Sequence, residues 1–131
     1  MKEPEQLFQK ALEAREKAYA PYSKYLVGAA LLCKDGRVFV GCNVENASYG
    51  LTVCAERNAI FSAVVAGIRD FEALAIVVQG EEVARPCGAC LQVICEFNPE
   101  MTLYLHNTSG KRETCTLRDL LPTPFRDFER S

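Results

Sequence analysis

The chain has 131 residues, a length that fits one domain around a single core, so we expect residues 1–131 to form one domain. Its 49% hydrophobic and 24% charged residues are typical of globular proteins and name no function. The net charge of −2, with Lys and Arg scattered along the chain, excludes the basic stripe that binding to a long nucleic acid requires.

Targeting signals and cysteine usage favour a protein of the cytoplasm. The first ten residues, MKEPEQLFQK, carry charges and lack the apolar core of a signal peptide. No later segment reaches the roughly 18 uninterrupted apolar residues of a membrane span. The seven cysteines are odd in number and follow no secretion signal, which favours reduced thiols and metal ligation over a disulfide framework.

Helical spacing of apolar residues predicts a first helix over about residues 4–19, which Pro21 ends. Apolar runs over 25–33 and 38–43 then predict two strands. Between them stands Asp35-Gly36, a pair typical of a tight turn. We therefore expect an antiparallel hairpin after the first helix.

Helices and strands alternate in the rest of the chain. Within residues 54–66, apolar side chains recur at helical spacing, and Gly67 ends the pattern. The run over 71–79 is too apolar for a half-exposed strand and indicates a central one. The remaining expected elements are a helix over 87–97, strands over 101–106 and 113–116, and a helix over 117–121. This order predicts an α/β fold, a three-layer α/β/α sandwich with a mixed five-stranded sheet.

Three cysteines stand at the starts of two expected helices. In Cys87-Gly88-Ala89-Cys90 two sulfurs are three residues apart, on one face of a helix start. Cys54 opens the preceding helix, and a helix N-terminus favours the thiolate form. If the two helix starts lie side by side, the three sulfurs converge. Three protein ligands with one open position are typical of a catalytic zinc.

Other interpretations of these cysteines remain open at this point. The pair Cys87 and Cys90 alone is compatible with a redox dithiol or with two packed core residues. A zinc-stabilised binding module would need a fourth protein ligand, for which the chain offers Cys95 or its single histidine, His106. Cys95 is rotated away from Cys90 on the same helix, and His106 belongs to a separate strand. The four other cysteines are interpreted as small core residues: Cys33, Cys42, Cys95 and Cys115.

Two charged residues follow Cys54 in the first helical turn. Glu56 could lie beside the metal without binding it and carry protons, although a Glu there also stabilises a helix N-terminus. Three thiolates leave Zn²⁺ with one surplus negative charge, which weakens its acidification of water. Arg57 can donate hydrogen bonds to thiolates and offset that charge, unless it is an ordinary surface residue.

These motifs resemble the cytidine deaminase family, in the small form whose three zinc ligands are all cysteine. The resemblance rests on Cys54-Ala55-Glu56-Arg57 and on Pro86-Cys87-Gly88-Ala89-Cys90. It extends over most of the chain through Ala20-Pro21-Tyr22-Ser23-Lys24 and Gly41-Cys42-Asn43-Val44-Glu45-Asn46-Ala47. It implies one Zn²⁺ per subunit and hydrolytic deamination of cytidine and deoxycytidine in pyrimidine salvage.

The resemblance also implies residues that bind substrate. Asn43, Val44 and Glu45 would form the sugar-binding segment, and strand periodicity puts residues 43 and 45 on one face. The alternative is that Asn43 and Glu45 only stabilise a turn at the end of the strand. A carboxylate at Glu45 would repel a 5′-phosphate and favour a nucleoside over a nucleotide. By similarity, Tyr25 would stack on the base and the Ala55 backbone would hydrogen-bond it.

Members of the small form resemble one another in forming homotetramers whose sites are completed by neighbouring subunits. By similarity, Phe125, Ala47 and Tyr49 would reach adjacent sites. An alternative substrate is a cytosine antibiotic such as blasticidin S, whose deaminases share the metal motif. The sugar-binding pair Asn43 and Glu45 argues against that alternative.

Overall fold

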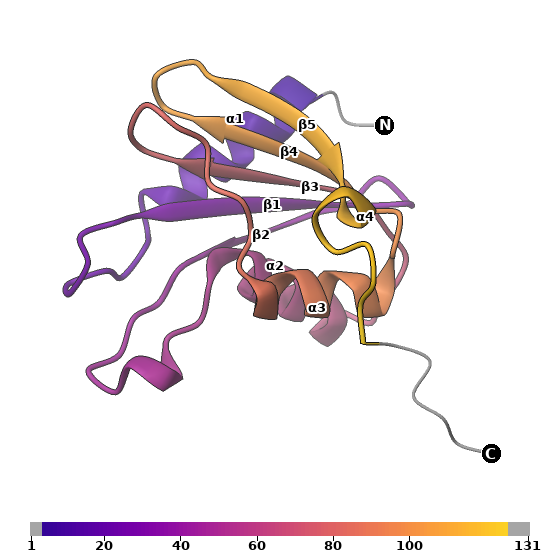
Figure 1. Cartoon of the computed structure of the whole chain (residues 1–131), viewed down its shortest axis with the longest axis horizontal. Helices are drawn as coiled ribbons and strands as arrows, with labels where there is room; N and C mark the ends of the chain where they lie inside the picture. Colours follow the sequence, from indigo (N-terminus) through magenta and orange to yellow (C-terminus); the bar gives the residue numbers. More distant parts are fainter. Residues whose placement is uncertain (1–3, 126–131) are drawn as a thin grey trace.

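The structure, a computed structural model, describes residues 4–125 of the chain (Figure 1). None of the helices among these residues is long and apolar enough to cross a membrane. In chain order the elements are α1 (Pro4–Arg15), β1 (Val27–Cys33), β2 (Val38–Cys42), the short 3-10 helix η1 (Tyr49–Leu51), α2 (Ala55–Val65), β3 (Phe71–Val78), α3 (Gly88–Phe97), β4 (Thr102–Asn107), β5 (Arg112–Thr116) and α4 (Leu117–Leu120).

The five strands form one mixed sheet in the order β2-β1-β3-β4-β5. Strand β1 is antiparallel to both β2 and β3. Strands β3 and β4 are parallel, and α3 connects them, as a parallel pair requires a crossover. Strand β5 returns antiparallel to β4. The expected mixed five-stranded sheet is confirmed.

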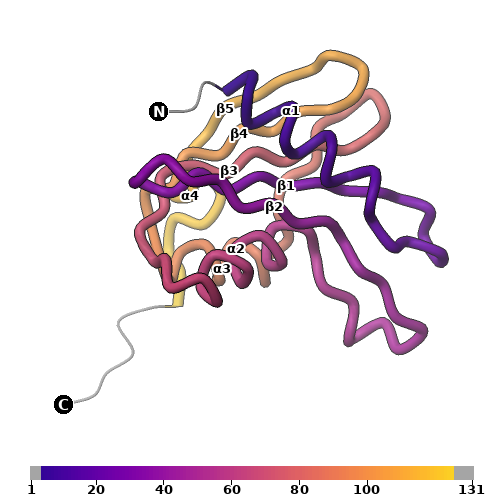
Figure 2. Tube along the Cα trace, turned by 180° about the vertical axis from the view of Figure 1, so that it is seen from behind, coloured from indigo at the N-terminus to yellow at the C-terminus, as the bar shows by residue number. Residues whose placement is uncertain are grey.

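Helices cover both faces of this sheet, as Figures 1 and 2 show from opposite sides. Alternate residues of β1 point to opposite faces, so Leu31 and Leu32 belong to different core clusters. Leu32 packs with Leu7 of α1, whereas Leu31 packs in the cluster that holds Ile60 of α2 and Ile94 of α3. The expected three-layer arrangement is therefore correct.

Two glycines set how closely the helices approach the sheet. A Cβ atom on Gly28 would lie 2.0 Å from the carbonyl oxygen of Ala11 in α1. A Cβ atom on Gly41 would lie 2.4 Å from the backbone nitrogen of Ala59 and 2.5 Å from the carbonyl oxygen of Ala55, both in α2. Because only glycine allows these approaches, Gly41 determines where the start of α2 lies.

The first helix is shorter than its periodicity predicts. It ends at Arg15, whereas we expected it to continue to about residue 19. The backbone of Tyr19 is instead paired with the segment after β2: its N–H donates to Asn43 O at 2.9 Å, and its carbonyl accepts from Glu45 N at 2.8 Å. These two tertiary hydrogen bonds override the local helical pattern.

Candidate active site

A cavity of about 260 Å³ opens at one end of the sheet, where the start of β1 lies beside the ends of β2 and β3. These ends coincide because β1 runs antiparallel to both neighbours. The starts of α2 and α3 reach the same place. The residues lining the cavity are Ser23, Tyr25, Val27, Asn43, Glu45, Thr52, Cys54, Ala55, Glu56, Ile76, Val78, Ala84, Arg85 and Cys87.

Three thiols converge at this end of the sheet. Cys54 and Cys87 are the N-cap residues of α2 and α3, and Cys90 lies in the first turn of α3. The sulfur atoms of the three lie within 4.8 Å of one another, and the Cys54 and Cys87 sulfurs are 3.9 Å apart. Two sulfurs bound tetrahedrally at about 2.3 Å from one zinc would lie ~3.8 Å apart, so the donor set fits this ion.

The thiol cluster is polarised by its own hydrogen bonds and by Arg57. Arg57 Nη2 donates to Cys54 Sγ at 3.6 Å. A hydrogen bond from Cys90, together with that from Arg57, lowers the pKa of Cys54. The same bond to Cys54, together with burial, raises the pKa of Cys90. The cluster therefore already favours a thiolate at Cys54, which is the form that ligates zinc.

Neither candidate for a fourth protein ligand joins the cluster. Cys95 is buried in the core between the sheet and α3. His106 belongs to β4, and its ring packs 5.1 Å from the ring of Phe8, which lies on the α1 side. Within residues 4–125 the three thiols thus provide three ligands, as in a catalytic zinc site and unlike a closed structural one.

Glu56 places a carboxyl group beside these thiols and away from solvent. It follows Ala55 in the first turn of α2, and only 6% of its surface is exposed. Burial is the main cause that raises the pKa of Glu56 to about 7, and the neighbouring Cys54 adds to this effect. A carboxyl group with a pKa near neutrality can both accept and donate a proton, which is the requirement for a proton carrier.

Asn43 follows the last residue of β2 and is 8% exposed. Its Oδ1 accepts from Val27 N at 2.9 Å, and its Nδ2 donates to Tyr25 O at 2.8 Å. The amide thus continues the pairing between β2 and the start of β1 by means of a side chain. It also lines the cavity, so Asn43 combines a structural role at the end of a strand with a position in the site.

Glu45 lies two residues further on and lines the same cavity. Its Oε1 accepts from Tyr22 N at 2.9 Å and from Ser23 N at 3.1 Å, and its Oε2 accepts from the Ser23 hydroxyl. These bonds, that of the Ser23 hydroxyl first, lower the pKa of Glu45. The side chain therefore presents a negative charge to the cavity.

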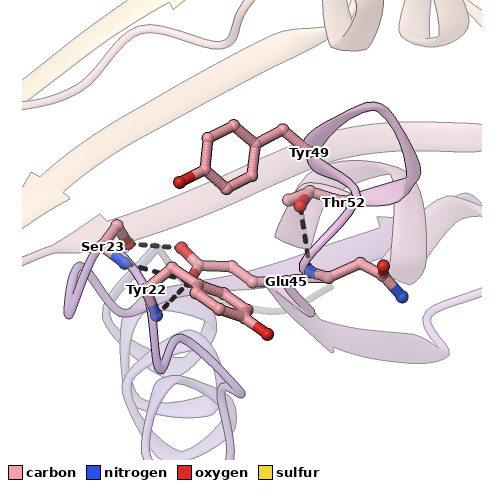
Figure 3. A pocket seen from close by; sticks show the side chains of 6 residues that line it. Tyr22, Ser23, Glu45, Tyr49 and Thr52 are labelled. Atoms are coloured by element: carbon pink, nitrogen blue, oxygen red, sulfur yellow. Dashed lines mark hydrogen bonds between the residues drawn. The ribbon is translucent and has the colours of Figure 1, made fainter.

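The other expected substrate-binding residues divide into two groups. Tyr25 and Ala55 line the cavity. Val44 lines a different hollow, of about 560 Å³, between the end of β2 and α2. Tyr49 lines a third, of about 420 Å³, beside Glu45 (Figure 3). Ala47 is exposed, and Phe125 is 70% exposed.

Three polar residues that line the cavity are not expected from the sequence. Ser23 belongs to a segment that carries the family resemblance, but the resemblance implies no role for it. Thr52 accepts a hydrogen bond from Asn46 N at 3.2 Å. Arg85 precedes Pro86 and pairs with Glu113 of β5 at 2.6 Å. In the sequence, its position two residues before Cys87 is the feature that indicates a place for Arg85 near the site.

An α/β/α sandwich with three convergent thiols and a buried glutamate beside them defines a zinc-dependent deaminase. Comparison with known proteins agrees. The model of the cytidine and deoxycytidylate deaminase zinc-binding region matches residues 1–106. The chain is 52% identical to a cytidine deaminase of Sporosarcina psychrophila, covering 92% of this chain and 90% of that one. It is also 52% identical to a cytidine deaminase of Halalkalibacterium halodurans, covering 91% of each chain.

A solved structure gives the same result for the fold. The crystal structure of cytidine deaminase from Burkholderia pseudomallei superposes with a TM-score of 0.91 at 51% identity, covering 95% of this chain and 100% of that chain. The chain belongs to the cytidine and deoxycytidylate deaminase family. The expected family, hydrolytic deaminase class and zinc dependence are confirmed.

Proposed function

We propose that this chain deaminates cytidine and deoxycytidine, giving uridine and deoxyuridine with release of ammonia, and so serves pyrimidine salvage. One observation carries the proposal. A single cavity is lined by two thiols of the cluster, the buried Glu56 and the polar pair Asn43 and Glu45. The same cavity therefore joins groups suited to the chemistry with groups suited to a sugar.

We assign the zinc ligands to Cys54, Cys87 and Cys90. A zinc ion with three protein ligands lowers the pKa of a water molecule in its fourth position towards about 7. Arg57 offsets the surplus negative charge of three thiolates through its hydrogen bond to Cys54.

Glu56 is the proton carrier in this proposal. Water adds to C4 of the cytosine ring, and its two protons pass through the Glu56 carboxylate. The first goes to N3 of the ring, and the second goes to the amine, which leaves C4 as ammonia. Uridine retains the oxygen at C4 and the proton at N3, so the reaction balances and needs no organic cofactor.

Substrate binding is assigned to residues around the same cavity. Tyr25 stacks on the base, and the backbone of Ala55, at a helix start where N–H groups lack helical partners, hydrogen-bonds it. Asn43 and Glu45 bind sugar hydroxyls. Val44 lies between them along the chain and acts through its backbone, which pairs with Tyr19 and Val53. The charge of Glu45 favours a nucleoside over a nucleotide.

We further propose a homotetramer in which Ala47, Tyr49 and Phe125 complete the sites of neighbouring subunits. Large apolar side chains that are exposed on one subunit support this assembly, because burying them between copies is favourable. They include Tyr49 at 77%, Val65 at 89% and Phe125 at 70% exposure. We place the protein in the cytoplasm, because a cluster of three reduced thiols suits a reducing compartment. One sheet runs through residues 4–125, which supports a single domain.

The decisive experiment measures ammonia release from cytidine, deoxycytidine, their monophosphates and blasticidin S by the zinc-loaded protein. We expect turnover of the two nucleosides and little of the monophosphates. Turnover of blasticidin S alone would refute the assigned substrate, and inactivity on every nucleoside would favour a binding module.

Two variants test the assigned residues. Glu56→Ala should keep zinc and lose turnover, so retained turnover would exclude Glu56 as the proton carrier. Cys87→Ala should lose zinc, and full metal occupancy by elemental analysis would refute the ligand set.

A further inference from the structure

The hydroxyl group of Ser23 connects two residues of the substrate cavity. It donates to Glu45 Oε2, and it accepts from Tyr25 N at 3.0 Å. Figure 3 shows the Ser23 side chain directed at the Glu45 carboxylate, with the Tyr22 backbone on the same side. One small side chain thus touches both the residue assigned to the sugar and the backbone of the residue assigned to the base.

The hydrogen bonds leave Glu45 with little remaining freedom. Oε1 already accepts from the two backbone N–H groups of Tyr22 and Ser23, and Oε2 accepts from the Ser23 hydroxyl. An ionised carboxylate offers about four acceptor positions, so one position on Oε2 stays available for a ligand. The backbone of Glu45 is also fixed, because its N–H donates to Tyr19 O at 2.8 Å.

The turn that carries Ser23 is held in an unusual backbone shape. Lys24 has a φ of 61°, in the left-handed region that side-chain-bearing residues seldom adopt. The turn is closed by Lys24 N donating to Ala20 O at 3.0 Å and by Lys24 Nζ donating to Pro21 O at 2.8 Å. This shape directs three donors, two N–H groups and the hydroxyl, at the same carboxylate.

We propose that Ser23 is a positioning residue that determines sugar specificity. It holds the Glu45 carboxylate so that its one available acceptor position meets the C2′ or C3′ hydroxyl of the nucleoside. The proposal rests on the proposed deamination of cytosine nucleosides. Loss of the Ser23 hydroxyl then weakens binding of a substrate that carries these hydroxyls and spares one that lacks them.

The test compares cytidine with 2′,3′-dideoxycytidine as substrates for three Ser23 variants and one control variant. Ser23→Ala should lower kcat/KM for cytidine about tenfold, mainly through KM, because a hydrogen bond to a charged group is removed. The loss for dideoxycytidine should stay below about threefold. Ser23→Thr keeps a hydroxyl and should restore cytidine turnover. Ser23→Cys keeps the volume with a weaker donor and should show a smaller loss of the same kind.

The matched control is Ser109→Ala, in the turn between β4 and β5, which should leave both substrates unaffected. An equal loss on both substrates, or no loss on cytidine, would overturn the proposal. A merely structural role of Ser23 would produce the equal loss, since a distorted cavity affects every substrate.

A second measurement is independent of turnover. We would follow the carboxylate carbon of Glu45 by NMR through an acid titration of the wild type and of Ser23→Ala. The Lys24 charge is present in both, so a higher pKa of Glu45 in the variant reports the lost hydroxyl; an unchanged pKa in a folded variant would contradict the proposed contact. Absence of ammonia release by the wild type would instead refute the proposed function.

Discussion

The guanidinium group of Arg57 lies 3.6 Å from the sulfur of Cys54, one helical turn away on α2. The Nε atom of the same side chain is buried, and no hydrogen-bond partner accepts from it among the described residues. Arg57 is thus held against the thiol cluster, and its charge also acts on the adjacent Glu56, where burial raises the pKa and the charge of Arg57 partly offsets that rise. Its positive charge is available to the metal site.

Replacing Arg57 by Gln should therefore reduce catalysis more than metal binding. Without the cation, three thiolates leave the zinc with surplus negative charge and a weaker effect on water, so kcat should fall roughly 10- to 100-fold while zinc is retained. Arg57→Lys should lose less. Steady-state kinetics with zinc analysis checks this, and Arg69→Gln, an exposed arginine, is the control.

Removing zinc should destabilise the protein. The three thiols come from the starts of two helices that are separated by β3 along the chain, so a common ligand binds the folded state selectively. A chelator should lower the Tm measured by calorimetry, and added zinc should restore it. Cys87→Ser should have the low Tm with or without chelator, whereas Cys115→Ser, outside the cluster, should respond as the wild type does.

Gly41→Ala should cost stability and activity together. The added methyl group would meet the backbone of Ala59 and Ala55 at 2.4 and 2.5 Å, so α2 must shift. We expect a loss of roughly 2 kcal/mol or more in the free energy of unfolding, with lower zinc affinity. Denaturant unfolding checks the first quantity. Gly50→Ala, where no atom lies within 4 Å of the new Cβ, should change it by less than about 0.5 kcal/mol.

His106 should make stability depend on pH. Burial, and then the charge of Arg112, lower the pKa of His106 below its ordinary value. The unfolded chain therefore binds a proton at His106 more readily than the folded chain does. The contribution of neutral His106 to the free energy of unfolding is complete above the unfolded pKa of about 6.5, and it is lost as pH falls through the folded pKa.

The measurement for His106 compares how the free energy of unfolding changes with pH in the wild type and in a variant. The wild type should lose more stability than His106→Gln on going from pH 7.5 to 5, because the variant lacks this titration. Glu56 titrates in both proteins, and its raised pKa changes stability in the opposite direction over part of this range. The difference between the two proteins removes that effect. A variant that loses stability as steeply as the wild type would contradict the assignment.

Much of the site could be predicted because it depends on local rules. Cys87 and Cys90 are three residues apart at a helix start, and Cys54 with Glu56 occupies another, so helix geometry alone places these groups. The convergence of the two helix starts was a hypothesis, since it depends on strand order, and the structure confirms that the three sulfurs meet.

The parts that could not be predicted depend on contacts between distant segments. The first helix ends at Arg15 because the Tyr19 backbone pairs with the segment after β2, and no property of residues 16–19 reveals that partner. The contact between Ser23 and Glu45 spans 22 positions in the chain and depends on the left-handed conformation of Lys24. The local helix and strand propensities of these residues predict neither contact.

Asn43 limits how the specificity of this enzyme could be redesigned. Its amide group is committed to Val27 N and Tyr25 O, so any replacement breaks the joint between two strands as well as the proposed contact with a sugar. The Glu45 carboxylate, by contrast, accepts its hydrogen bonds from a surface turn. Engineering of a new sugar preference would therefore begin with Glu45 and its turn, leaving the Asn43 amide as part of the scaffold.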